Sequence, residues 1–174
     1  RTRQVLQDND IAAVLLYDPC NIRYATDTSN MQLWTMHNLS RYCLIFSDGP
    51  VILFDYHNCA HLHDEKRLPN GQLTVNEIRP AIVWAYFAAG ERAPEQAMRW
   101  GADIASLMQQ YGGGNKRLAI DICEQLGIAQ LNKHGIETLS GMEYMEHARG
   151  IKSAEELQLM QWTITVCQKG MERM

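Results

Sequence analysis

Three histidines form the first group of side chains whose spacing could bind a metal ion. His57, His61 and His63 occur as H-x3-H-x-H, and on a helix only His57 and His61 would share one face. A zinc site needs further ligands and fixed hydrogen-bond partners behind them, and the adjacent Asp64 and Glu65 would not face these histidines together. The pattern therefore favours a polar surface stretch after a strand over a metal site.

Two other patterns fall short of a catalytic site. Gly112–Gly114 follows a predicted helix instead of opening one, and no Lys-Ser/Thr pair comes after it, so it indicates a turn and not a phosphate-binding loop. Cys123 could act as a nucleophile with His134 or His147 as its base, but nothing in the sequence brings these side chains together. The residues alone do not specify a complete active site.

A polar segment with three large functional side chains is the remaining candidate. The stretch YDPCNIRYATDTSNMQLWTMHN sets Tyr24, Trp34 and His37 among Asp, Asn, Thr and Ser residues. In one interpretation, this is an ordinary surface loop whose Trp34 packs onto the domain. In the other, it is a rim or lid that offers amphipathic rings to a ligand or a partner. The residues alone leave both interpretations open.

Composition excludes several classes of protein. A length of 174 residues suggests one domain, or one domain and the start of another. The net charge of -4 gives no basic footprint for nucleic acid, and no apolar run approaches the ~20 residues that span a bilayer. The five cysteines are widely spaced and odd in number, which predicts reduced thiols in a cytoplasmic protein.

The first half of the chain predicts a strand, a helix and a hairpin. Ile11–Asp18 is rich in branched residues and predicts a short buried strand. Asp18 can cap a helix that begins at Pro19 and contains PCNIRYAT. The apolar runs RYCLIFS and PVILFDY flank Asp48-Gly49, which predicts a β-hairpin because these two residues tolerate the positive φ of a tight turn.

The second half alternates between predicted strands and helices. The segments are QLTVNEIR, APEQAMRWGADIASLMQQYG, KRLAID, CEQLGIAQLNKHG and IETLS. In the first helix of this set, the apolar residues at helical spacing are Ala97, Trp100, Ile104, Leu107, Met108 and Tyr111. This order predicts a layered α/β domain with a mixed sheet.

A different unit is predicted at the end of the chain. Ser153 and Glu156 form a capping box that opens a helix, and Leu157, Met160 and Ile164 begin an apolar stripe that continues to Cys167 or Met171. No stop signal precedes Met174, so we expect the first helix of a second domain. The predicted division is 1–148 for the first domain and 149–174 for the junction and this helix.

Three stretches together resemble the N-terminal domain of the creatinase/prolidase family of pita-bread metalloenzymes. DIAAVLLYDPCNIRYATDTSN is similar to its opening strand and Asn-Ile-x-Tyr helix, and RYCLIFSDGPVILFDY to the hairpin that follows. ARGIKSAEELQLMQ resembles the junction into the catalytic domain, although Gly150 stands where many relatives carry an apolar residue. The polar segment around Trp34 is most similar to the dimethylsulfoniopropionate-cleaving lyase branch.

The resemblance implies a fold and a division of labour. The fold would be a mixed sheet flanked by helices, resembling a ribonuclease-H-like layer. The family's Asp, His and Glu metal ligands belong to the second domain, so we expect no cofactor in this chain. A divalent metal (Fe, Mn, Zn or Co) is expected in the catalytic domain, and the 174-residue chain alone is predicted to be inactive.

The resemblance also implies partners and a role for the polar segment. The expected partners are the chain's own C-terminal catalytic domain, a second copy in a homodimer, and a small-molecule substrate, with no nucleic acid or membrane. Because such domains commonly lend a loop to the partner subunit's active site, Tyr24, Trp34 and His37 are predicted to cap that pocket. The whole enzyme would be a lyase that releases dimethyl sulfide. The alternatives are a Xaa-Pro dipeptidase or aminopeptidase, which is a hydrolase, and a free-standing module that binds a small ligand or a protein.

Overall fold

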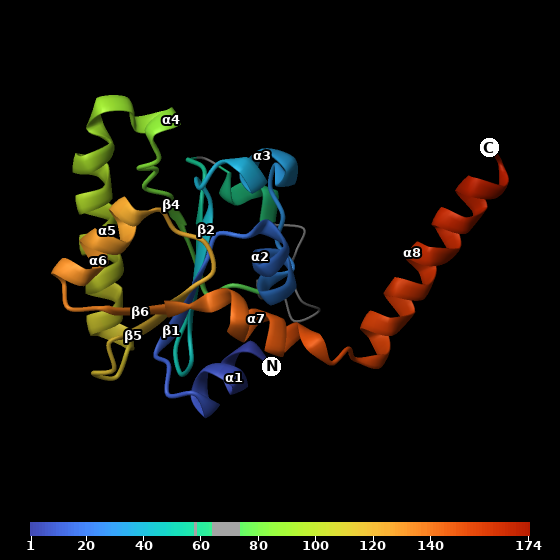
Figure 1. The fold of residues 1–174 in the computed structure, drawn as a ribbon, viewed down its shortest axis with the longest axis horizontal. Coiled ribbons are helices and arrows are strands. Elements are labelled where there is room, and N and C mark those ends of the chain that lie inside the picture. The colour runs from blue at the N-terminus through green and yellow to red at the C-terminus, as the bar shows by residue number, and fades with distance from the viewer. Residues whose placement is uncertain (58, 64–73) are drawn as a thin grey trace.

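A six-stranded mixed sheet between two layers of helices forms the body of the molecule (Figure 1). The computed structural model describes residues 1–57, 59–63 and 74–174. In chain order the strands are β1 (Ala13–Leu16), β2 (Tyr42–Phe46), β3 (Val51–Asp55), β4 (Glu77–Pro80), β5 (Arg117–Ile120) and β6 (Glu137–Ser140). Their order across the sheet is β4-β3-β2-β1-β5-β6. The predicted α/β architecture with a mixed sheet is confirmed.

The direction of β2 makes the sheet mixed. β2 runs antiparallel to its neighbours β1 and β3, whereas the pairs β1–β5, β5–β6 and β3–β4 are parallel. The carboxyl ends of β1, β3, β4, β5 and β6 therefore lie at one edge of the sheet, and the amino end of β2 joins them there. Segments that follow those strands, or precede β2, meet at this edge.

Helices cover both faces of the sheet. On one side lie α1 (Thr2–Asp8), α2 (Pro19–Thr26) and α7 (Gly141–Gly150), and on the other lie α5 (Ala93–Tyr111) and α6 (Gln125–Lys133) (Figure 1). Alternate residues of β1 enter different cores, with Ala13 and Leu15 on the α5 side and Val14 and Leu16 on the α1 side. A strand buried on both faces reads as a continuous apolar run, which is why this segment shows no polar alternation.

Local signals explain where the helices begin and which faces they bury. The Asp18 carboxylate accepts a hydrogen bond from the Asn21 backbone N–H at 2.9 Å, and Pro19 occupies the first turn of α2. The predicted face of α5 is buried at Ala97, Trp100, Ile104, Leu107 and Met108, with Tyr111 partly buried beside them. Gly112 caps the end of α5, as the glycine run predicts.

The structure differs from the sequence-based expectations in two regions of the first half. β2 and β3 form the predicted hairpin, but residues 47–50 connect them and neither Asp48 nor Gly49 has a positive φ. The longer connection removes the need for left-handed residues. The strand predicted over QLTVNEIR begins only at Glu77, and its first two residues lie outside the described part of the chain, as does the turn predicted at Pro69-Asn70-Gly71.

Short helices form in the polar segment around Trp34, in the histidine-containing stretch, and in a segment for which no element was predicted. They are α3 (Gln32–His37), η1 (Ala60–His63), α4 (Tyr86–Ala89) and η2 (Gly90–Arg92). α3 and α4 both lie beyond the carboxyl edge of the sheet (Figure 1). Their placement matters for the candidate site.

The last helix stands apart from the body. α8 (Ala154–Glu172) begins with the predicted capping box, in which Ser153 and Glu156 exchange side chain–backbone hydrogen bonds. Its axis points away from the sheet and none of its residues is buried (Figure 1). The exposed apolar side chains include Leu157, Leu159, Met160, Trp162, Ile164, Val166 and Met171.

Candidate functional site

Two left-handed residues shape the polar segment before α3. Asp27 ends α2 with φ of 54°, and Met31 precedes α3 with φ of 45°. A long side chain such as methionine rarely adopts a positive φ, so the surrounding contacts must hold this turn in place. Between these residues, Thr28 is buried and Asn30 is partly buried.

A buried ion pair provides the polar partners for this segment. Arg41 and Asp55 lie opposite each other, one residue outside the Tyr42–Phe54 pair of β2 and β3. Arg41 Nε donates to Asp55 Oδ2 at 3.0 Å, and the two side chains are 0% and 1% exposed. His63 Nε2 lies 2.8 Å from the same carboxylate oxygen. The three side chains form a polar cluster, built around this ion pair, that is sealed from solvent.

The polar segment attaches to this cluster. Arg41 Nη2 donates to Thr28 Oγ1 at 2.8 Å, and Asn30 Nδ2 donates to Asp55 Oδ1 at 2.9 Å. Burial alone would raise the pKa of Asp55. The attraction of Arg41 and the hydrogen bonds from His63 and the Tyr56 backbone outweigh this effect and lower that pKa. Asp55 is therefore a carboxylate that anchors the loop, with no free lone pair facing solvent.

Sequence reasoning missed Arg41 and Asp55, and it placed His63 on a polar surface stretch, which was wrong because His63 is buried against Asp55. One signal could have found the first two, because they are charges of opposite sign at the outer ends of the predicted hairpin. In an antiparallel pair such positions are cross-strand neighbours. His63 carried no comparable signal, since its partner is known only once η1 is placed on the edge of the sheet.

An aromatic cluster lies above this anchor. The Trp34 ring on α3 packs against Tyr56 with a centroid distance of 5.6 Å and meets Phe87 on α4 edge-on at 5.5 Å. Trp34 is 40% exposed and Phe87 is exposed beside it. Leu33 and Met36 on α3 and Tyr86 on α4 are exposed too, so the two helices present what we call the α3/α4 surface. Exposed apolar side chains that gather in one patch are typical of interaction sites, whereas single scattered ones are not.

The structure separates the three residues that the sequence grouped. Trp34 and His37 lie three residues apart on α3, and His37 is exposed at its C-terminal end. Tyr24 belongs to α2, where its hydroxyl donates to the backbone oxygen of Ala148 at 2.9 Å. The guanidinium of Arg1 lies 5.5 Å from the centre of the Tyr24 ring. Tyr24 therefore contacts the end of α7 and the N-terminus, whereas Trp34 contacts α4 and the end of β3.

The remaining candidates from the sequence do not form sites. Within residues 1–57, 59–63 and 74–174, no three His, Cys, Asp or Glu side chains converge as metal ligands would. Of the three clustered histidines, His63 is buried against Asp55. Burial raises the pKa of Cys123 to about 12, which leaves almost none of the thiolate that a nucleophile needs. Among the helices of these described residues, none combines the length and the apolar character that a bilayer-spanning segment needs.

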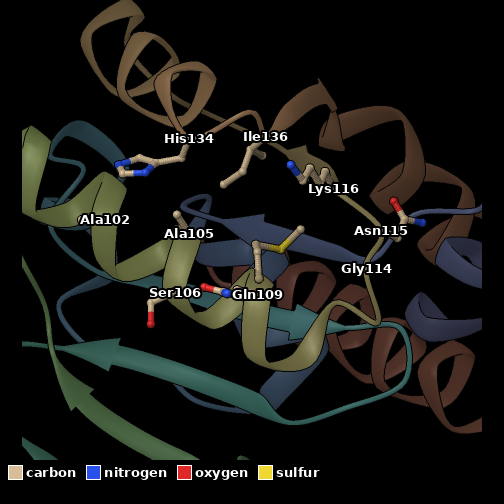
Figure 2. A pocket seen from close by; sticks show the side chains of 10 residues that line it. Ala102, Ala105, Ser106, Gln109, Gly114, Asn115, Lys116, His134 and Ile136 are labelled. Atoms are coloured by element: carbon tan, nitrogen blue, oxygen red, sulfur yellow. The ribbon is translucent and has the colours of Figure 1, made fainter.

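A surface hollow of about 450 Å³ lies at the opposite edge of the sheet, before β5 and β6 (Figure 2). Figure 2 shows Ser106 and Gln109 on α5, with Lys116 and His134 across from them. Lys116 and His134 are both exposed to solvent. The hollow contains none of the predicted capping residues, so it does not define the candidate site.

Two curated proteins are similar to the chain along nearly its whole length. Dimethylsulfoniopropionate lyase DddP of Roseovarius nubinhibens is 35% identical over 174 residues, which is all of this chain and 38% of the lyase. The enzyme of the same name from Roseobacter denitrificans is 33% identical over 163 residues, or 94% of this chain and 35% of that protein. The chain thus spans little more than a third of these relatives. No family model matches it.

Solved structures with low sequence identity share the fold. A prolidase from Thermococcus sibiricus superposes with a TM-score of 0.62 at 12% identity, covering 99% of this chain and 41% of the prolidase. The N-terminal domain of a Xaa-Pro dipeptidase from Lactobacillus brevis gives a TM-score of 0.53 at 14% identity. That comparison covers 83% of this chain and 95% of the isolated domain. These structures establish the fold alone, and they match the architecture expected from the sequence.

Proposed function

Because the chain has the creatinase/prolidase N-terminal fold and is related over nearly its whole length to two dimethylsulfoniopropionate lyases, we propose that it is the non-catalytic N-terminal domain of such an enzyme. The 35% identity across all 174 residues carries this proposal. In the whole protein, a following catalytic domain would supply the divalent metal and its ligands. The absence of a converging ligand set from the described residues is compatible with that division.

The domain's own contribution would be to dimerise and to cap the pocket of the partner subunit. The α3/α4 surface supports this role, because it presents Trp34, Phe87 and Tyr86 at one edge of the sheet on an anchored scaffold. A sulfonium substrate carries a positive charge, and an aromatic face attracts such a cation by roughly 0.5–2 kcal/mol. An aromatic cap would also keep water from the reaction. Trp34 and His37 are the proposed capping residues on this surface.

Peptide hydrolysis is the second candidate, because the structural neighbours include prolidases and a Xaa-Pro dipeptidase. The sequence relationship favours the lyase, since those structures share only 12–17% identity with the chain whereas the lyases share 33–35%. A lyase and a peptidase would both use this domain as a cap. They would differ in the substrate that the capped active site binds.

The test begins with the gene beyond the codon for Met174. If the reading frame continues and encodes spaced Asp, His and Glu ligands, the encoded protein is expressed with Fe, Mn, Zn or Co. It is then assayed with dimethylsulfoniopropionate and with a Xaa-Pro dipeptide. Release of dimethyl sulfide would support the lyase, and dipeptide cleavage would support the alternative. A stop codon directly after Met174 would overturn the proposal in favour of a free-standing binding module.

Substitution of Trp34 tests the cap itself. We expect Trp34→Ala to raise KM for the sulfonium substrate about two- to thirtyfold, as loss of a cation–π contact requires, and Trp34→Phe to recover part of that loss. Met98→Ala is the matched control, because Met98 is an exposed apolar residue of α5 outside the α3/α4 surface. Unchanged KM and kcat in Trp34→Ala would remove Trp34 from the cap. Sedimentation of the whole enzyme as a monomer would contradict dimerisation.

A further inference from the structure

Apart from the linker, the contact that joins α8 to the body among the described residues is the ion pair between Arg1 and Glu156. None of its residues is buried, and its axis leaves the body directly after the linker that follows α7 (Figure 1). A hollow of about 310 Å³ separates its first turns from α2 and the end of α7, lined by Tyr24, Arg149, Lys152, Glu156, Leu159 and Met160. Close apolar packing therefore does not set the angle between α8 and the body.

Polar contacts bridge this hollow. Arg1 Nη2 donates to Glu156 Oε1 at 2.5 Å, and Arg1 Nη1 donates to the backbone oxygen of Ile151 in the linker. The same guanidinium lies over the Tyr24 ring, whose hydroxyl holds the oxygen of Ala148 near the end of α7. One cation thus touches α2, the linker and the first turn of α8.

We propose that Arg1, Tyr24 and Glu156 form a latch that fixes the orientation of α8 relative to the body. Gly150, the last residue of α7, is the hinge that the latch restrains. A Cβ atom at Gly150 would meet nothing within 4 Å, so this residue is not required there by close packing. Tyr24 is accordingly a positioning residue of the junction, which is a role separate from the capping assigned to Trp34.

The contact between Arg1 and Glu156 in the latch is an ion pair at the protein surface. Both partners are partly exposed, at 42% for the Arg1 side chain and 29% for Glu156, and an ion pair of this kind is weakened by salt. The hydrogen bond from Arg1 is the largest cause of the lowered pKa of Glu156, ahead of the Ser153 backbone contact. A partly exposed ion pair of this kind biases an orientation only weakly, so screening by salt is expected to release it.

Two neighbouring glutamates allow a matched test. In Glu156→Gln, the amide oxygen can still accept the Ser153 N–H in the capping box, because glutamine serves in that position, but the charge that faces Arg1 is lost. Glu155→Gln removes a charge from the same first turn of α8, and Arg1 is not among the groups that shift the pKa of Glu155. Both variants remove one negative charge near the N-terminus of α8, but only Glu156→Gln removes the charge that pairs with Arg1.

Native thiols allow the orientation to be measured. Cys20 on α2 and Cys167 on α8 are exposed and lie on opposite sides of the junction, so spin labels on them report the distance across it. Cys59 and Cys123 are partly exposed and are replaced by Ser. Cys43 stays unlabelled because it is buried, and burial raises the pKa of its thiol to about 12. The distance distribution is recorded by pulsed electron resonance for the parent chain, Arg1→Gln, Glu156→Gln and Glu155→Gln.

We expect Arg1→Gln and Glu156→Gln to raise the fraction of molecules outside the main distance peak about two- to fivefold. Glu155→Gln should match the parent, and 1 M salt should move the parent toward the Glu156→Gln distribution, since charges are then screened within ~3 Å. Equal distributions for the parent and Glu156→Gln would overturn the latch, as would an equal effect of Glu155→Gln. Circular dichroism of each variant confirms that α8 is still helical. None of these results depends on an enzymatic activity.

Discussion

α5 and α8 are helices of equal length, at 19 residues each, with opposite surroundings. α5 buries one face against the sheet and α6, whereas α8 buries nothing. The buried apolar residues of α5 share a single face, but the apolar residues of α8 fall into two stripes, one through Met160 and Ile164 and the other through Trp162 and Val166. An apolar repeat in a helix thus predicts which face can be buried. That face stabilises the fold only where another element packs against it.

The largest expected difference between these helices concerns their tryptophans. Trp100 on α5 is fully buried and packs on Trp84 with a centroid distance of 5.2 Å, whereas Trp162 on α8 is 59% exposed. Trp100→Ala should lower the free energy of unfolding by about 3–5 kcal/mol, because it leaves a cavity in the core. Trp162→Ala should change it by less than about 0.5 kcal/mol. Urea unfolding followed by circular dichroism measures both, and similar values would mean that α8 packs on the body in solution.

Two glycines provide a smaller contrast with opposite signs. A Cβ atom on Gly101 of α5 would lie 2.8 Å from the Cβ of Gln130 on α6, while one on Gly170 of α8 would meet nothing within 4 Å. Gly101→Ala should destabilise the body by about 1–2 kcal/mol, since overpacking outweighs the better helix propensity of alanine. Gly170→Ala should raise the local stability of α8 by up to about 1 kcal/mol. Amide exchange resolves the second effect, and slower exchange in α5 of Gly101→Ala would contradict the first.

Acid should affect the two regions through different carboxylates. The pKa of Asp55 is lowered in the folded chain, so its stabilising contribution is complete above about pH 3.9 and is lost as the pH falls through the lowered value. Between pH 5 and 3, Asp55→Asn should therefore lose stability less steeply than the parent in urea unfolding. Protonation of Glu156 should instead release α8 without unfolding the body. Equal pH dependence of Asp55→Asn and the parent would show that Asp55 does not titrate with folding.

The elements that the sequence predicted well are those with local causes. Asp18 and Pro19 start α2, Ser153 and Glu156 start α8, and apolar spacing marks the buried face of α5. α3 was missed because Met31 offers no capping side chain and the helix has no apolar repeat that separates an inner from an outer face. β4 was predicted too long because an alternating pattern does not say how far its partner β3 extends.

The candidate site was predictable only in part. Trp34 and His37 are three residues apart on α3, so their proximity follows once that helix is known. Tyr24 was grouped with them because it is close in sequence, but α2 turns it toward Ala148 and Arg1. Phe87 joins Trp34 from a distant segment, a contact that depends on the order of β3 and β4 in the sheet. Contacts between distant segments carry no local signal.

The position of β1 in the middle of the sheet has a consequence for how the chain is made. β1 pairs on one side with β2, the next strand in the chain, and on the other side with the much later β5, where Ala13 lies opposite Leu118. During synthesis on a ribosome, the hairpin side can form early, while the other edge of β1 stays open until β5 has emerged. An open apolar strand edge invites pairing with other chains. Docking of the β5–β6 unit onto β1 is therefore the step expected to govern both the folding rate and the yield of the newly made protein.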